Sequence, residues 1–203
     1  MENGMRSLTS NVRIVEPKDV VGRKIRTMSN KVHMTAFEKA GASAVPMVFS
    51  ELFTALQQNV IDGQENPLLN IQDMSFYEVQ KYLTLTEHFY DITVFCVNTK
   101  LYNSVPADIR AAIDEAAAYM TEVHRRECIK QNDNVLDFFK QKSKMEIIRL
   151  TPEQKAAWKK AMMPTYDIYR KEIGAEYLDK VIAEVARLQA QYDAGKLNTS
   201  RWR

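Results

Sequence analysis

Two consecutive strand–helix patterns between residues 24 and 63 constrain the fold more than any other feature of this sequence. The first predicts a strand over 24–28 and a helix over 31–40 that Ser29 and Asn30 can cap and that ends at Gly41. The second predicts a strand over 45–48, followed by a helix that Ser50 caps. Successive strand–helix units favour right-handed crossovers and a mostly parallel sheet. We therefore expect an α/β fold.

The rest of the chain predicts further strands and three more helices. A nearly continuous apolar run over 93–97 is typical of a strand at the centre of a sheet. Apolar residues spaced by three and four predict one unusually long helix over 106–141, long enough to cross more than one lobe. Residues 1–20 are expected to be irregular. The remaining expected elements are strands over 82–86 and 146–149, a helix that starts at Thr151, a helix over 175–192 and a polar tail over 193–203.

Composition and charge exclude several classes of protein. The 203 residues include 28 Lys and Arg against 26 Asp and Glu, a net charge of +2, so a chain-wide basic field for nucleic acid is missing. Hydrophobic residues make up 45%, with only six glycines and six prolines, which predicts a packed, helix-rich protein. No run approaches the roughly 18 apolar residues of a transmembrane helix, and residues 1–20 contain no export signal.

Sequence patterns of common enzymes and metal sites are missing. There is no phosphate-binding glycine loop, His-Glu-x-x-His, CxxC or G-x-S-x-G sequence. His33, His88 and His124 lie in different predicted elements without ligand spacing, so we expect them at the surface or the edge of the core. An enzyme that uses Glu65 with His33 or His88 as acid and base is the weakest alternative. We expect no catalysis, no cofactor and no bound metal.

Arg26 is the first candidate for ligand binding. It lies near the carboxyl end of the first predicted strand, which is where open α/β sheets bind ligands. Its guanidinium can hold a carboxylate through two parallel hydrogen bonds, helped by the positive end of the following helix. An arginine whose donors are satisfied by an internal carboxylate or a backbone carbonyl is an equally open alternative.

Two more candidates follow in the second unit. Residues 62–67 read Asp-Gly-Gln-Glu-Asn-Pro, which can be a simple turn. Pro67 keeps Asn66 extended, so the Asn66 amide can point at a ligand with little loss of entropy. Phe49 lies directly before the expected helix cap at Ser50. It can be an aromatic wall for an organic ligand or part of the core.

The chain resembles a family of transport proteins. Arg26, Phe49, the run Gly-Gln-Glu-Asn-Pro at 63–67 and the run Phe-Tyr-Glu-Val-Gln-Lys-Tyr-Leu at 76–83 resemble the solute-binding proteins of tripartite ATP-independent periplasmic (TRAP) transporters. The resemblance includes 22–26, 41–42, 46–51 and 54–57, and extends more weakly to about residue 190. It implies a two-lobed, type II periplasmic-binding-protein-like α/β fold with a long helix that spans both lobes.

The resemblance also implies roles for individual residues. Arg26 would clamp the carboxylate of the ligand, and Asn66 would hydrogen-bond to it. Phe49 would pack against the ligand, and Arg6 would add a second carboxylate contact. Glu65, beside Asn66, is the fifth expected ligand-binding residue. The ligand stays open among four-carbon dicarboxylates, keto acids, sugar acids and sialic acid.

By the same resemblance, this chain starts where the second lobe of the family begins. Residues 1–90 would form the α/β ligand-binding domain of the second lobe, and 91–131 a remnant of the first lobe with the start of the spanning helix. Residues 132–190 would return to the second lobe and form the C-terminal helices, with 191–203 as a polar tail. The first lobe would then be incomplete.

The resemblance implies a periplasmic protein that captures an organic acid and delivers it to the membrane subunits of a TRAP permease. The absence of an export signal conflicts with that location, which favours a shortened chain with a periplasmic parent. The alternative function is a non-binding fragment or assembly module that oligomerises through the exposed first-lobe remnant.

Overall fold

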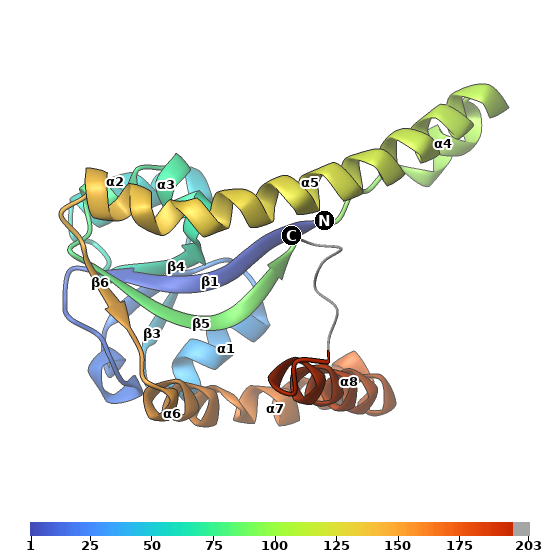
Figure 1. Ribbon diagram of the computed structural model, residues 1–203. Helices are drawn as coiled ribbons and strands as arrows, with labels where there is room; N and C mark the ends of the chain where they lie inside the picture. Colours follow the sequence, from blue (N-terminus) through green and yellow to red (C-terminus); the bar gives the residue numbers. More distant parts are fainter. Residues whose placement is uncertain (197–203) are drawn as a thin grey trace.

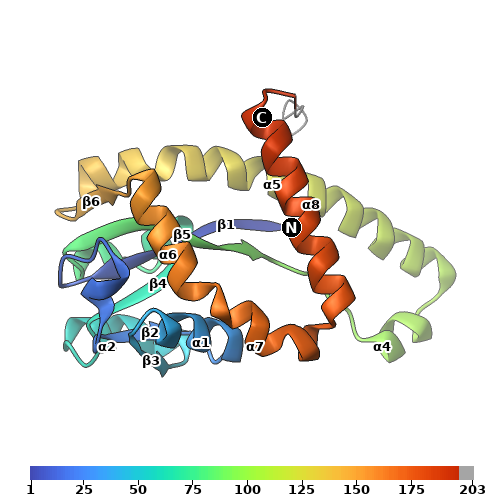
Figure 2. The ribbon, with the colours of Figure 1, turned by 90° about the horizontal axis from the view of Figure 1, so that it is seen from below.

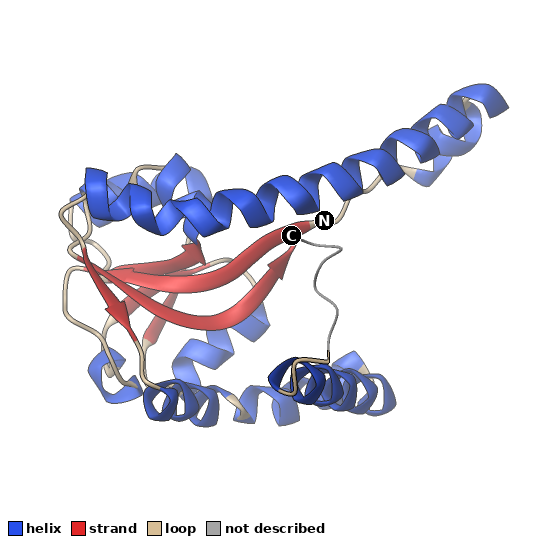
Figure 3. Ribbon diagram, viewed as in Figure 1, coloured by secondary structure: helices blue, strands red, loops and turns tan. Residues whose placement is uncertain are grey.

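A six-stranded mixed sheet forms the centre of the molecule, between two layers of helices (Figures 1 and 3). The computed structural model describes residues 1–196. Strands β2 and β3 are parallel, as are β2 and β4, and β5 and β6, whereas β1 is antiparallel to both β4 and β5. The spatial order is β3 (Ser43–Pro46), β2 (Lys24–Thr27), β4 (Gly63–Pro67), β1 (Glu2–Ser10), β5 (Tyr82–Ile92) and β6 (Glu146–Arg149).

Helices cover both faces of the sheet (Figures 1 and 2). One face carries α2 (Leu52–Gln57), α3 (Leu68–Asp73) and the long α5 (Ala107–Lys142). The other carries α1 (Lys31–Lys39), α6 (Pro152–Met162), α7 (Pro164–Ile173) and α8 (Ala175–Asp193). The helix α4 (Thr99–Ser104) lies beside the part of α5 that extends beyond the sheet. Within residues 1–196, no helix is both long and apolar enough to cross a membrane.

The core consists of two apolar clusters, one on each side of the sheet. The first includes Phe37 of α1 and Trp158 of α6, and the Trp158 indole N–H donates to the Val15 carbonyl at 2.9 Å. The second includes Phe76 and Phe139, where α3 and α5 cover the opposite face. Burial of these large side chains stabilises each layer by roughly 1.5–3 kcal/mol per residue.

Several local expectations are confirmed. The Asn30 side chain caps α1 by accepting from the backbone N–H groups of Val32 and His33. Gly41 follows that helix with φ +98°, a conformation that favours glycine. The expected long helix is α5, with 36 residues, and the expected last helix is α8. The polar tail was expected to begin at 193, but Asp193 still belongs to α8, and residues 197–203 lie outside the described residues.

The expectation that residues 1–20 are irregular was wrong. Residues 2–10 form β1, which lies between β4 and β5 near the middle of the sheet. The charged residues of this segment argued against a buried strand. Arg6 is nevertheless buried, because it forms ion pairs with Glu65 of β4 and Asp91 of β5. The insertion of β1 also makes the sheet mixed rather than mostly parallel.

Two further expectations in the middle of the chain were wrong. Residues 63–67 are the buried strand β4, not a turn, because their polar side chains satisfy one another inside the sheet. Ser50 does not cap the next helix, because a 3₁₀ turn over Phe49–Glu51 precedes α2, which begins at Leu52. The second strand–helix unit is therefore present, with β3 two residues earlier than expected.

The apolar run at 93–97 does not form the expected central strand. Strand β5 ends at Ile92, and the side chains of Val94 and Phe95 are 70% and 55% exposed. An apolar run is buried only where other elements cover it. Among the described residues no strand pairs with this run, which makes one backbone hydrogen bond, from the Thr93 N–H to the Met1 carbonyl at 3.2 Å. The assignment of residues 91–131 to a different lobe stays a prediction.

The start of α6 yields a first testable prediction. Thr151 Oγ1 accepts from the Gln154 backbone N–H, and the Gln154 side chain accepts from the Thr151 N–H, which confirms the predicted capping box. We expect Thr151→Ala to lower the free energy of unfolding by about 1 kcal/mol. Thr151→Ser keeps the hydroxyl and should cost much less in the same urea titration. Equal losses in the two variants would contradict the role of the hydroxyl.

Candidate functional site

A hollow of about 260 Å³ opens beside β1, β2 and β4. Four of the five predicted site residues line it, namely Arg6, Arg26, Phe49 and Asn66. The fifth, Glu65, is fully buried and is not among the lining residues. The remaining wall is formed by Asn3, Met28, Asn70 and Asp91, none of which the sequence singled out.

Arg26 is partly satisfied by the protein itself and partly free for a ligand. Its Nε and Nη2 donate to the Met47 carbonyl at 3.0 and 2.6 Å, so a backbone group holds one side of the guanidinium. Its Nη1 is buried and has no hydrogen-bond partner among the described residues. The guanidinium carbon lies 5.7 Å from the centre of the Phe49 ring. Burial lowers the pKa of this guanidinium, as does nearby Arg6, while Glu65 opposes the change.

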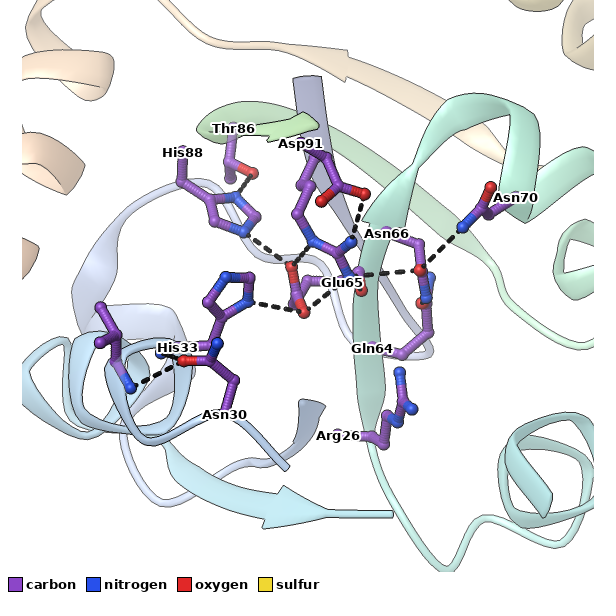
Figure 4. A network of polar contacts seen from close by, with 12 residues as sticks. Arg26, Asn30, His33, Gln64, Glu65, Asn66, Asn70, Thr86, His88 and Asp91 are labelled. Atoms are coloured by element: carbon purple, nitrogen blue, oxygen red, sulfur yellow. Dashed lines mark hydrogen bonds and ion pairs between the residues drawn. The ribbon is translucent and has the colours of Figure 1, made fainter. Parts of the chain in front are cut away.

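Arg6 lines the hollow, but its guanidinium is bound by an ion-pair network with Glu65 and Asp91, two residues labelled in Figure 4. Only 1% of the residue is exposed. Its Nε and Nη2 donate to the two carboxylate oxygens of Glu65, at 2.5 and 2.9 Å. Its Nη2 also reaches the Glu65 carbonyl and Asn66 Oδ1, and its Nη1 donates to Asp91 Oδ2 at 3.1 Å. The positive charge of Arg6 is therefore matched by acidic groups of the protein itself.

Two histidines approach the carboxylate of Glu65, which is also the ion-pair partner of Arg6 (Figure 4). Burial would raise the pKa of the Glu65 carboxyl, but its contacts with His33, His88 and Arg6 outweigh that effect and hold the pKa well below its usual value. His88 Nε2 lies 3.2 Å from Glu65 Oε2, and its Nδ1 lies 2.7 Å from Thr86 Oγ1. His33 Nδ1 lies 3.7 Å from Glu65 Oε1, an ionic distance rather than a hydrogen bond.

The expectation that the histidines lie at the surface or the core edge was wrong for His88, whose side chain is buried, whereas the His33 side chain is 16% exposed. His33 comes from α1 and His88 from β5, and both face the carboxylate of Glu65 on β4. The His88 side chain is 2% exposed. Sequence spacing gave no indication of this cluster, since its members lie 23 or more positions apart and meet only through the strand order.

Asn66 is fixed by a row of buried polar side chains. Its Nδ2 donates to Gln64 Oε1 at 2.5 Å, and its Oδ1 accepts from Arg6 and, at 3.4 Å, from Asn70. Gln64 in turn donates to Thr9 Oγ1 at 2.8 Å. A side-chain amide carries two N–H donors, so one donor of Asn66 is left for another acceptor. Among residues 1–196, no group of His, Cys, Asp and Glu side chains could hold a metal ion.

The buried His88 predicts a loss of stability in acid. Burial lowers the pKa of its imidazole below the ordinary 6.5, although contact with Glu65 opposes this, so the unfolded chain binds a proton first as the pH falls. The free energy of unfolding should therefore decrease as the pH falls below about 6.5. Urea titrations from neutral to mildly acidic pH should show that the free energy of unfolding decreases less in His88→Gln than in the unchanged chain. The matched variant His124→Gln, on α5, should keep the decrease of the unchanged chain; identical profiles for all three would contradict the assignment.

Comparison with known proteins places this fold. Residues 1–172 match the family described as bacterial extracellular solute-binding protein, family 7. A C4-dicarboxylate-binding periplasmic protein of Shewanella loihica is 37% identical over 188 residues, which are 90% of this chain and 54% of the relative. A sialic acid-binding periplasmic protein of Vibrio cholerae is 33% identical over 181 residues, 89% of this chain and 55% of the relative. The chain thus spans about half the length of these relatives.

Solved structures agree with the sequence relatives. A sugar acid-binding protein of Advenella mimigardefordensis in complex with galactonate has a TM-score of 0.86 at 34% identity, covering 92% of this chain and 60% of the other. A TRAP solute-binding protein of Sulfurospirillum deleyianum with bound succinate has a TM-score of 0.84 at 37% identity, covering 90% and 60%. The predicted α/β fold class is confirmed, and the partial coverage agrees with the expected incomplete lobe. This chain belongs to family 7 of the bacterial extracellular solute-binding proteins.

Proposed function

We propose that this chain is the greater part of a periplasmic solute-binding protein that captures an organic acid and delivers it to a TRAP membrane permease. The observation that carries the proposal is the buried Nη1 of Arg26, which has no partner among the described residues. A buried charged donor without a partner costs free energy, and a ligand carboxylate in the adjoining hollow would remove that cost.

The other lining residues fit the same ligand. The unused N–H of Asn66 can donate to the carboxylate that Arg26 holds. Phe49 is 37% exposed, lies beside the Arg26 guanidinium and offers an apolar surface to the carbon chain of the acid. Glu65, which the hollow does not reach, would act by holding Arg6 in place.

The relatives support the kind of ligand and the partner. Relatives carry names for binding C4-dicarboxylates, sialic acid and 2,3-diketo-L-gulonate, and the names describe them as periplasmic. Every one of these solutes carries a carboxylate, the group that an arginine binds through paired hydrogen bonds. The wall of the hollow opposite β4 would come from the part of the family fold that this chain does not span, and that lobe would close on the acid.

Native mass spectrometry tests the proposal directly. The 203-residue chain is mixed with millimolar succinate, galactonate or sialic acid, and the bound mass is read for each acid. We expect a one-to-one complex with at least one of them, together with an increase in the thermal midpoint. A chain that binds none of the acids and shows no thermal shift would contradict the proposed function.

An exposed apolar surface supports the second candidate, an assembly module. A larger hollow of about 500 Å³ is lined by Met1, residues 93–95 and one side of α5, with no acidic or basic side chain in its wall. Sedimentation at increasing concentration should show self-association if this surface pairs two chains, and Phe95→Ser should reduce it. A monomer at all concentrations would contradict this candidate.

A further inference from the structure

We propose that the acid this site prefers is a hydroxylated monocarboxylate of the sugar-acid type, and that Asp91 is the residue that rejects a second carboxylate. The inference rests on the proposed function, because it concerns the ligand of the same hollow. The relatives leave the question open: one has bound succinate and another galactonate. The charges around the hollow of this chain favour a sugar acid such as galactonate over a dicarboxylate such as succinate.

The first step is a count of the charges at the hollow. The hollow is lined by the positive Arg6 and Arg26 and the negative Asp91. A second negative group, Glu65, is buried outside the lining and binds Arg6. Both acidic groups are bonded to Arg6, so its charge is already compensated inside the protein. Arg26 has no acidic partner in the described residues and donates only to a backbone carbonyl. The four charges sum to zero, but Arg26 is the one of these two guanidinium groups that binds no carboxylate of the described residues, and its Nη1 has no partner there. It can therefore hold one carboxylate of the ligand.

The second step is the position of the Asp91 carboxylate (Figure 4). Asp91 lines the same hollow as Arg26, and its side chain is 23% exposed. It accepts from Asn3 Nδ2 at 2.9 Å and from Arg6 Nη1 at 3.1 Å, and both bonds end on Oδ2. No hydrogen bond to Oδ1 is found in the described part of the chain, so this carboxylate, whose residue lines the hollow, keeps free acceptor capacity.

The third step is the chemistry of that oxygen. An ionised carboxylate only accepts hydrogen bonds, so its suitable partner is an O–H donor. A ligand that places hydroxyl groups beyond its own carboxylate can bond to Asp91 while Arg26 holds the acid. A dicarboxylate would bring its second negative charge against Asp91, and like charges in a partly buried site repel each other. Asn3 and Asn70, also in the wall, can donate to or accept from further hydroxyl groups.

The test is a comparison of two acids on the same chain. Dissociation constants of galactonate and succinate are measured by calorimetry for the unchanged chain, for Asp91→Asn and for Asp73→Asn. Asp73 ends α3 and is exposed, so its variant makes the same charge change away from the hollow. We expect galactonate to bind at least tenfold more tightly than succinate to the unchanged chain. Asp91→Asn should reduce this ratio at least fivefold, mainly by tighter succinate binding, and Asp73→Asn should preserve it.

The outcomes separate this inference from the proposed function. Tighter binding of succinate to the unchanged chain, or an unchanged ratio in Asp91→Asn, would overturn the role of Asp91 while leaving an acid-binding protein. Failure of both acids to bind would overturn the preference proposed here, and failure of sialic acid as well would contradict the proposed function itself. The ratio in the unchanged chain does not depend on how well any variant folds, and circular dichroism of Asp91→Asn shows whether loss of the bond to Arg6 has altered the fold.

Discussion

Glu65→Gln is expected to lower the free energy of unfolding by about 3 kcal/mol, because it removes one half of a buried ion pair. Glu65 is fully buried and Arg6 is 1% exposed, so water cannot solvate the Arg6 guanidinium once the Glu65 charge is removed. The glutamine keeps the shape and one acceptor oxygen, but it leaves Arg6 with only Asp91 as an acidic partner. It also brings an amide N–H₂ group against the donors of Arg6 or His88.

Urea unfolding measures this effect, with Glu184→Gln as the matched control. Glu184 pairs with Arg187 on the exposed surface of α8, so the same chemical change should have little effect on the free energy of unfolding there. Replacing both members of the buried pair, as in Arg6→Met with Glu65→Leu, should recover much of the loss, since no charge is then left unpaired. A loss below about 1 kcal/mol for Glu65→Gln would contradict the structural role of the pair.

The local elements of this chain could be predicted because their determinants are close in sequence. The Asn30 cap, Gly41 and the capping box of Thr151 each act over a few residues, and the structure places all three where the sequence did. Helix α5 follows from a periodic apolar pattern, which is also local. Strand β4 was mistaken for a turn, because polar residues such as Gln64 are buried in it through side-chain bonds that a periodic pattern cannot show.

The site could be predicted only in part, for a reason that lies in the strand order. Arg26, Phe49 and Asn66 stood out because of their positions in the predicted strand–helix units. Arg6 came from the family resemblance, and Glu65 was included as the neighbour of Asn66. The network around Arg6 depends on β1 lying between β4 and β5, which puts Arg6 opposite Pro67 on one side and Phe89 on the other. That register is a long-range property of the sheet. His88 directly precedes Phe89 in β5 and Asp91 lies two residues after it, so their contacts with Glu65 and Arg6 could not be predicted without that register.

Arg26→Ala is expected to remove the stabilisation that an organic acid gives to this chain. A ligand present at a hundredfold excess over its dissociation constant raises the free energy of unfolding by about 2.7 kcal/mol. The alanine variant lacks the guanidinium that would hold the carboxylate, so the acid should no longer shift its unfolding curve. Without ligand, the free energy of unfolding of the variant should stay close to that of the unchanged chain, because the change removes a buried charge together with the bonds to the Met47 carbonyl that it makes within residues 1–196.

Two further variants show whether the geometry or only the charge of Arg26 matters. Arg26→Lys keeps a positive charge but cannot offer two parallel donors, so it should recover only a small part of the ligand response. Arg13→Ala removes an exposed arginine that pairs with Glu146, and its response to the acid should equal that of the unchanged chain. A full ligand response in Arg26→Ala would contradict the clamp. If Arg26→Lys responded fully, charge alone would be sufficient, and the orientation that Met47 and Phe49 impose on the guanidinium would have no part in binding.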